Sequence, residues 1–232
     1  MNRIHPTAIV GEAVQLGSDN VIGPYAVLIG EVLLGDGNWV GPFASIGAPS
    51  EVRGVPHEAH WEQGGTGGPV RIGSRNVFRE GIAIHAGYAS ETVIGDDCFL
   101  MNKTYIAHDC HLGDGVTMAA GSVMGGHTHV GDGANLGLNA AVHQRAVVGP
   151  GAMVGMGSVV TERRPIPPHA KAFGSPASVR GVNRVGMQRR GVDDAAIDLL
   201  AAAYAQGRVP ALAELPASLA DDFAWWERET TR

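Results

Sequence analysis

An aliphatic residue or methionine stands at every sixth position from Ile94 to Ile166. The members of this series are Ile94, Leu100, Ile106, Leu112, Met118, Met124, Val130, Leu136, Val142, Val148, Val154, Val160 and Ile166. A helix repeats about every 3.6 residues and a strand about every two, so neither yields a strict period of six. This hexapeptide repeat predicts a parallel β-helix whose short strands each place one large and one small side chain inside.

The same period is present from Ile4 to Ile46, so we expect the β-helix to start near the first residue. Asn20 and Asn38 are polar exceptions in its small interior positions. The repeat breaks over residues 47–71, which are rich in glycine and proline, and again over residues 86–93. Long irregular segments inside a compact domain are usually functional. We therefore predict that residues 47–71 form a flap at the active site.

Composition favours one large domain with a small appendage. The chain has 34 glycines among 232 residues and only 6% aromatic residues, which suits a turn-rich interior of aliphatic and small side chains. The net charge of −6 gives no overall attraction for nucleic acid. We find no apolar run of signal-peptide or membrane-spanning length, so we expect a cytoplasmic protein without an integral membrane segment. Cys98 and Cys110 fall in small interior positions and are expected to be packing residues.

The repeat stops where the composition changes to alanine, leucine and charged residues. We predict an all-β domain over residues 1–177, a left-handed parallel β-helix, and a small α-helical domain over residues 178–232. Asp193 or Asp194 can cap a helix that runs to Gln206, and a second helix should carry the last two tryptophans. This helical domain is expected to cover the end of the coil.

Histidines gather on one predicted face or at its edges. If three hexads make one triangular coil, positions 18 apart stack at the strand spacing of about 4.8 Å. One face then holds the hexads that begin at Ile84, Ile106, Met124 and Val142. These hexads contain His85, His108, His111, His127, His129 and His143.

This face has residues suited to acyl transfer. A neutral imidazole such as that of His108 can remove the proton from a hydroxyl that attacks a carbonyl, and the neighbouring Asp109 can orient the ring. The Gly125-Gly126 pair lies one coil further along and offers a backbone N–H that no side chain shields, as an oxyanion hole requires. A serine or cysteine nucleophile is not needed, and the sequence has no nucleophile elbow.

Two other classes of function remain open from these residues. Histidines on adjacent coils could bind Zn²⁺, as in the β-helical carbonic anhydrases of the gamma class, and His111 and His129 are the best pair for this. A solvated turn position is the simpler interpretation of that pair. A catalytically silent structural β-helix is the third possibility. We expect that the protein needs neither a metal ion nor a cofactor.

Several short segments match one known family in order and spacing. They are Ile4 to Val10, Ile106-Ala107-His108-Asp109-Cys110, Gly126-His127, Val142-His143-Gln144, and Val182-Asn183 followed by Arg189-Arg190-Gly191. Together they resemble the UDP-N-acetylglucosamine O-acyltransferases of lipid A biosynthesis. The resemblance covers the whole chain apart from about the last two dozen residues.

The resemblance implies a homotrimer with active sites between subunits. It implies that His108 is the general base for the sugar 3-hydroxyl, that Asp109 orients it and that the N–H of Gly126 holds the oxyanion. The donor would be a 3-hydroxyacyl thioester of acyl carrier protein, and the acceptor a nucleotide sugar similar to UDP-N-acetylglucosamine. The implied substrate contacts are His85, His127, His143, Gln144, Asn183, Arg189 and Arg190.

The sequence departs from the family pattern where the acceptor is recognised. Tyr105 replaces a histidine, Val185 a glutamate, and Pro176 lies where the family has an Asn-His pair. The flap offers Glu51 and Arg53 in place of an aspartate and a lysine. A different nucleotide sugar therefore remains possible as acceptor, and so does a CoA-dependent transfer to an amine or an amino sugar.

Met156 aligns with the position that closes the acyl pocket in this family, where glycine accompanies longer chains. A methionine side chain fills space that the end of a long chain needs. The resemblance therefore implies a shorter acyl group of about ten carbons.

Overall fold

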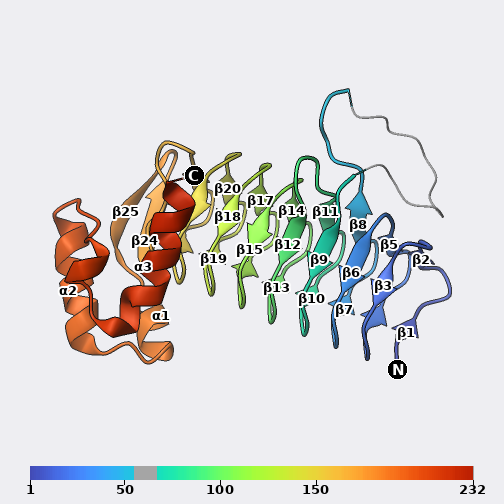
Figure 1. The fold of residues 1–232 in the computed structure, drawn as a ribbon, viewed down its shortest axis with the longest axis horizontal. Helices are drawn as coiled ribbons and strands as arrows, with labels where there is room; N and C mark the ends of the chain where they lie inside the picture. The colour runs from blue at the N-terminus through green and yellow to red at the C-terminus, as the bar shows by residue number, and fades with distance from the viewer. Residues whose placement is uncertain (55–66, 232) are drawn as a thin grey trace.

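The computed structural model describes residues 1–54 and 67–231. It is a parallel β-helix of very short strands, followed by a hairpin and a small group of helices that lie at its C-terminal end (Figure 1). The strands form three sheets, which we call sheets A, B and C, and the chain visits them in turn.

Sheet A has ten strands, of which the last two form an antiparallel hairpin. They are β1 (Arg3–Ile4), β4 (Val21–Ile22), β7 (Trp39–Val40), β10 (Val77–Phe78), β13 (Phe99–Leu100), β16 (Thr117–Met118), β19 (Asn135–Leu136), β22 (Met153–Val154), β24 (Ala170–Gly174) and β25 (Ala177–Val182). The eight strands of sheet B are β2 (Ile9–Val10), β5 (Val27–Leu28), β8 (Ser45–Ala48), β11 (Ala83–His85), β14 (Tyr105–Ile106), β17 (Val123–Met124), β20 (Ala141–Val142) and β23 (Val159–Val160). The seven strands of sheet C are β3 (Gln15–Leu16), β6 (Val32–Leu34), β9 (Val70–Ile72), β12 (Thr92–Ile94), β15 (His111–Leu112), β18 (His129–Val130) and β21 (Val147–Val148).

The predicted 18-residue stacking is confirmed by the register of the strands. In sheet B, Ile106 pairs with Met124 and Met124 with Val142. From Ile22 onward, the large side chain of each hexad is almost fully buried, whereas Ile4 in the first hexad is exposed. The histidine-bearing face is sheet B with its corner to sheet C, as expected. His111 and His129 lie at its edge, where they begin strands β15 and β18 of sheet C and pair with each other.

The flap leaves the coil after a strand of sheet B, as predicted. β8 ends at Ala48, and the chain rejoins the coil in sheet C, where β9 begins at Val70. The part of the predicted flap over residues 55–66 lies outside the described residues.

Asparagines inside the N-terminal coils form a ladder. The side-chain oxygens of Asn20 and Asn38 accept hydrogen bonds from the backbone N–H groups of Asn38 and Asn76, at 2.8 and 2.9 Å. The Asn76 side chain does the same for Cys98 at 2.7 Å. The three asparagines are 0% exposed. The side-chain oxygens of the three asparagines are therefore satisfied by the next coil, whereas Nδ2 of Asn76 has no partner within the described residues.

The C-terminal helices are α1 (Arg184–Arg189), α2 (Asp194–Ala205) and α3 (Ala217–Thr230), with a 3₁₀ turn η1 (Leu212–Glu214) between the last two. Asp193 caps α2 through the N–H of Ala196, as the sequence predicted. The predicted domain boundary after residue 177 falls inside the hairpin, since β25 pairs with β24. None of the helices within the described residues combines the length and apolar character that crossing a membrane requires.

The substitution Asn38→Ala should destabilise the fold. It leaves the buried N–H of Asn76 without its acceptor, which costs about 1–3 kcal/mol of unfolding free energy. Asn135→Ala, on the exposed side of β19, is the matched control and should change it by less than about 0.5 kcal/mol. Urea unfolding of both variants measures the difference, and equal effects would contradict the ladder.

Candidate active site

The corner between sheets B and C stacks the expected catalytic residues. The turns after β14, β17 and β20 place Asp109, His127 and Arg145 at equivalent positions, with φ angles of 59°, 57° and 61°. The N–H of His127 donates to the carbonyl of His108 at 3.1 Å, and the N–H of Arg145 donates to the carbonyl of Gly126 at 2.9 Å. Three coils thus present their turn residues side by side.

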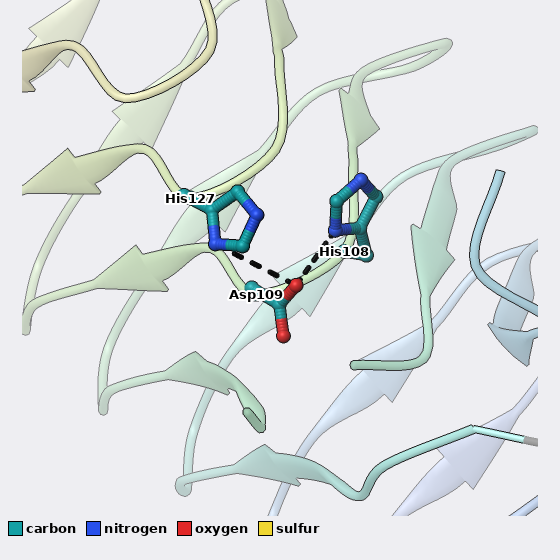
Figure 2. A group of neighbouring side chains, drawn as sticks. All are labelled: His108, Asp109 and His127. Carbon is teal, nitrogen blue, oxygen red and sulfur yellow. Dashed lines mark hydrogen bonds and ion pairs between the residues drawn. The ribbon is translucent and has the colours of Figure 1, made fainter. Parts of the chain in front are cut away.

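His108 and Asp109 form a hydrogen-bonded pair (Figure 2). Nδ1 of His108 lies 2.7 Å from Oδ2 of Asp109, whose side chain is fully buried. Burial by itself raises the pKa of Asp109, but the bond from His108 and those from the backbone of residues 88–90 outweigh it and hold this pKa at about 2. An ionised carboxylate only accepts hydrogen bonds. The ring proton of neutral His108 is therefore on Nδ1, and Nε2 has a free lone pair.

The loop over residues 88–90 anchors this carboxylate. Oδ1 of Asp109 accepts hydrogen bonds from the N–H groups of Tyr88, Ala89 and Ser90 at 2.9, 3.0 and 2.7 Å. The hydroxyl of Ser90 adds a fourth at 3.0 Å. No role was predicted for Tyr88, Ala89 or Ser90, and the only signal in the sequence is the interruption of the repeat over residues 86–93.

Gly126 lies directly against the ring of His108. A Cβ at this position would be 2.7 Å from Cε1 and 2.8 Å from Nε2 of His108, so only glycine leaves room for the ring. The N–H groups of its neighbours Gly125 and His127 are used in the coil-to-coil ladder. Within the described residues no backbone carbonyl takes the N–H of Gly126. This group is available to a ligand beside the base.

A hollow of about 580 Å³ lies on sheet B next to Gly126, and we call it the sheet B hollow. It is lined by Tyr105, Val123, Met124, Gly125, Gly126, Val142, His143 and Gln144. The predicted substrate residues His143 and Gln144 thus share it with the glycine pair. Its exposed surface is mostly apolar, which suits a hydrocarbon chain.

Tyr105 links the sheet B hollow to the start of the flap. Its hydroxyl donates a hydrogen bond to the carboxylate of Glu51, and burial together with this carboxylate raises the pKa of Tyr105. His85 lies on the other side of Glu51, with Nε2 3.7 Å from Oε1, and its Nδ1 is 2.9 Å from the carbonyl oxygen of Pro49. Glu51, the flap residue named as a candidate from the sequence, is therefore next to the site.

The other predicted residues lie at different corners of the same chain. Asn183 caps α1 by accepting from the N–H of Gly186, and its amide donates to the carbonyl of Gly151 at the corner between sheets C and A. Arg190 lies there too, with Nη2 3.3 Å from Oδ2 of Asp222 on α3. The neighbouring Arg189 is exposed.

Met156 lies at the corner between sheets A and B and is 74% exposed. A single chain therefore does not bring Met156, Asn183 and His108 to one point. The width of sheet B separates Met156 from the base, and sheet C separates Asn183 from it.

His111 and His129, which the sequence suggested as metal ligands, do not belong to the cluster of side chains that could hold an ion. The rings of His111 and His129 stack with centroids 4.7 Å apart, and Nδ1 of His129 is 2.9 Å from Oε2 of Glu229 on α3. Among the described residues, the three side chains that could hold an ion together are instead His108, Asp109 and His127, with ligand atoms within 4.8 Å of one another.

Comparison with known proteins gives the family. Residues 91–126 match the bacterial transferase hexapeptide family, and residues 166–207 match the second domain of UDP-N-acetylglucosamine O-acyltransferase. A Paraburkholderia xenovorans protein named acyl-[acyl-carrier-protein]–UDP-N-acetylglucosamine O-acyltransferase is 43% identical over 219 residues, covering 88% of this chain and 82% of that one. The chain belongs to this family of acyltransferases.

Other members agree with this assignment. The acyltransferase of the same name from Thermodesulfovibrio yellowstonii is 38% identical over 88% of this chain and 83% of its own length. The solved UDP-N-acetylglucosamine acyltransferase from Campylobacter jejuni has a TM-score of 0.72 and 31% identity, covering 87% of this chain and 83% of that one. That from Bacteroides fragilis has a TM-score of 0.74 and 25% identity over 95% and 90%. The predicted β-helical fold and the assignment as an O-acyltransferase are confirmed.

The site makes a prediction about His127 in this acyltransferase. Burial lowers the pKa of His127 below its usual 6.5, Arg145 and His108 add to this, and Asp109 opposes it. Because the unfolded chain takes up this proton at higher pH than the folded chain does, His127 makes folding less favourable as pH falls through about 6.5. An NMR titration should therefore give a midpoint for His127 below 6.5, and Arg145→Gln should move it upward. A wild-type midpoint at or above 6.5 would contradict this environment.

Proposed function

We propose that this protein transfers a 3-hydroxyacyl group from acyl carrier protein to the 3-hydroxyl of UDP-N-acetylglucosamine or a similar nucleotide sugar, as in lipid A biosynthesis. The names of the relatives state this carrier and this sugar. One observation supports the chemistry most directly. The His108–Asp109 pair lies against the unshielded backbone of Gly126 at the edge of an apolar hollow.

His108 acts as the general base in this mechanism. Its Nε2 takes the proton of the sugar hydroxyl while the hydroxyl oxygen forms a bond to the thioester carbon, and Asp109 stabilises the imidazolium that results. The N–H of Gly126 donates to the oxyanion of the tetrahedral intermediate. When the C–S bond breaks, the leaving thiolate recovers the proton from His108. No metal ion or cofactor enters these steps.

The acyl chain is proposed to cross the outer face of sheet B. It would begin at Gly126, pass Val123 in the sheet B hollow and end at Met156 on the opposite edge of the sheet. The exposed side chain of Met156 would then limit the length of the chain to about ten carbons.

The nucleotide is proposed to be bound by a second copy of the chain. Asn183 and Arg190 lie at the corner between sheets C and A, so within one chain they are on the far side of sheet C from His108. A homotrimer with sites between subunits would bring the C/A corner of one copy to the B/C corner of the next. Arg189 and the partly exposed Arg190 would supply positive charge for the diphosphate.

A transfer assay with purified protein tests the proposed reaction. Wild-type enzyme should acylate UDP-N-acetylglucosamine from 3-hydroxyacyl carrier protein, and His108→Ala should lower kcat/KM by about 10²–10⁴ because the general base is lost. Asp109→Asn should also lower it, since a neutral amide no longer fixes the Nδ1 proton. His111→Ala, in the stacked pair of sheet C, is the control and should retain activity. Undiminished turnover by His108→Ala would show that His108 is not the general base. Transfer from acyl-CoA but not from acyl carrier protein would show that the proposed donor is wrong.

Met156→Gly tests the path of the chain. Removing the side chain opens the end of the groove, so the ratio of kcat/KM for 14-carbon over 10-carbon donors should rise by about tenfold or more. Leu138→Gly, one coil earlier at the same corner, is the matched control. An unchanged ratio in Met156→Gly, or an equal change in both variants, would show that Met156 does not close the groove.

A further inference from the structure

Figure 2 shows two imidazoles pointing at one carboxylate oxygen. Oδ2 of Asp109 is 2.7 Å from Nδ1 of His108 and 3.6 Å from Nδ1 of His127. We propose that His108, Asp109 and His127 bind a transition-metal cation such as Zn²⁺, and that this ion inhibits the enzyme by changing the tautomer of His108.

The separations fit a tetrahedral ion with little movement. Ligand atoms about 2.0–2.1 Å from Zn²⁺ are about 3.3 Å from one another in tetrahedral geometry. The two separations from Asp109 fall on either side of this value. The rings of His108 and His127 are perpendicular, with centroids 5.1 Å apart, so their nitrogens approach the carboxylate from different directions. Two imidazoles and one carboxylate also form a ligand set that favours Zn²⁺ over Mg²⁺ or Ca²⁺.

The carboxylate is held ready for an ion. Oδ1 of Asp109 accepts four hydrogen bonds from the 88–90 loop, and Oδ2 accepts only a longer one of 3.3 Å from the N–H of Ala89, so Oδ2 faces mainly the two histidines. Hydrogen bonds of this kind orient the carboxylates that bind metals in proteins. Asp109 therefore needs no rearrangement to become a ligand.

The fourth coordination position has access to solvent. His127 lines a polar hollow of about 400 Å³ on the sheet C side, which we call the sheet C hollow. Arg145, Glu162 and Glu229 line it as well, so the cation meets charges of both signs. The side chains of His108 and His127 are 16% and 28% exposed, which gives an ion a path to their nitrogens.

The inhibition follows from the tautomer, and this part of the inference rests on the proposed function. A metal ion can bind Nδ1 of His108 only through a lone pair on that nitrogen. Neutral imidazole has this lone pair only when its proton has moved from Nδ1 to Nε2. The ring then carries the same number of protons, but Nε2 has no lone pair to accept the proton of the acceptor hydroxyl. The bound ion thus removes the general base without unfolding the site.

Metal binding is tested apart from activity. Titration of the wild-type protein with Zn²⁺ by calorimetry, and with Co²⁺ by its visible absorption, should show one ion per chain. Replacing either proposed ligand, as His127→Gln or Asp109→Asn, should weaken binding by about tenfold or more. His111→Gln should leave it unchanged. Equal binding by wild type and both ligand variants, or a loss of binding in His111→Gln, would overturn the site.

A wild-type experiment covers the case in which a ligand variant does not fold. Zn²⁺ should shift the NMR ring signals of His108 and His127 and leave those of His111 in place, and the reverse pattern would overturn the site. In the transfer assay, Zn²⁺ should lower turnover about tenfold or more, with recovery on addition of EDTA. If the protein binds zinc but shows no transfer in the metal-free state, the proposed function is refuted and the proposed metal site still stands. Full activity with zinc bound at this site would overturn the inhibition.

Discussion

Backbone hydrogen bonds join the turns of neighbouring coils, and the positions of the candidate catalytic side chains depend on this ladder. His127 donates to His108 and Arg145 donates to Gly126 across neighbouring coils. Residues 18 apart therefore become neighbours, about 4.8 Å apart. The same spacing brings the backbone of Gly126 against the ring of His108. The constant spacing between coils thus sets the geometry of the site.

The irregular segment over residues 86–93 also contributes to the candidate site, because it binds the carboxylate of Asp109. A buried carboxylate such as Asp109 is unfavourable unless hydrogen bonds replace its water. The excursion that interrupts the repeat supplies four donor groups from Tyr88, Ala89 and Ser90, and His108 supplies a fifth. The ionised Asp109 then fixes the proton on Nδ1 of His108. The excursion is therefore part of the candidate site, because it keeps Asp109 charged.

The hexapeptide period was enough to predict the three-faced coil and the meeting of His108 with Gly126, since both follow from counting residues. The count also placed His111 and His129 at the edge of this face, stacked on successive coils, and the two residues pair at the start of β15 and β18 in sheet C. Contacts of the irregular segments could not be predicted, such as those of Glu51 with Tyr105. The period of the repeat does not predict the conformation or contacts of segments that lack the repeat.

The central claim is that one corner of the coil, between sheets B and C, carries the chemistry. A crystal structure of the protein with its acylated nucleotide-sugar product would test this most directly. The account predicts that the esterified oxygen of the sugar lies within hydrogen-bonding distance of Nε2 of His108, with the acyl chain across sheet B toward Met156. A product bound with this oxygen away from His108, or with its acyl chain on sheet C, would contradict the account.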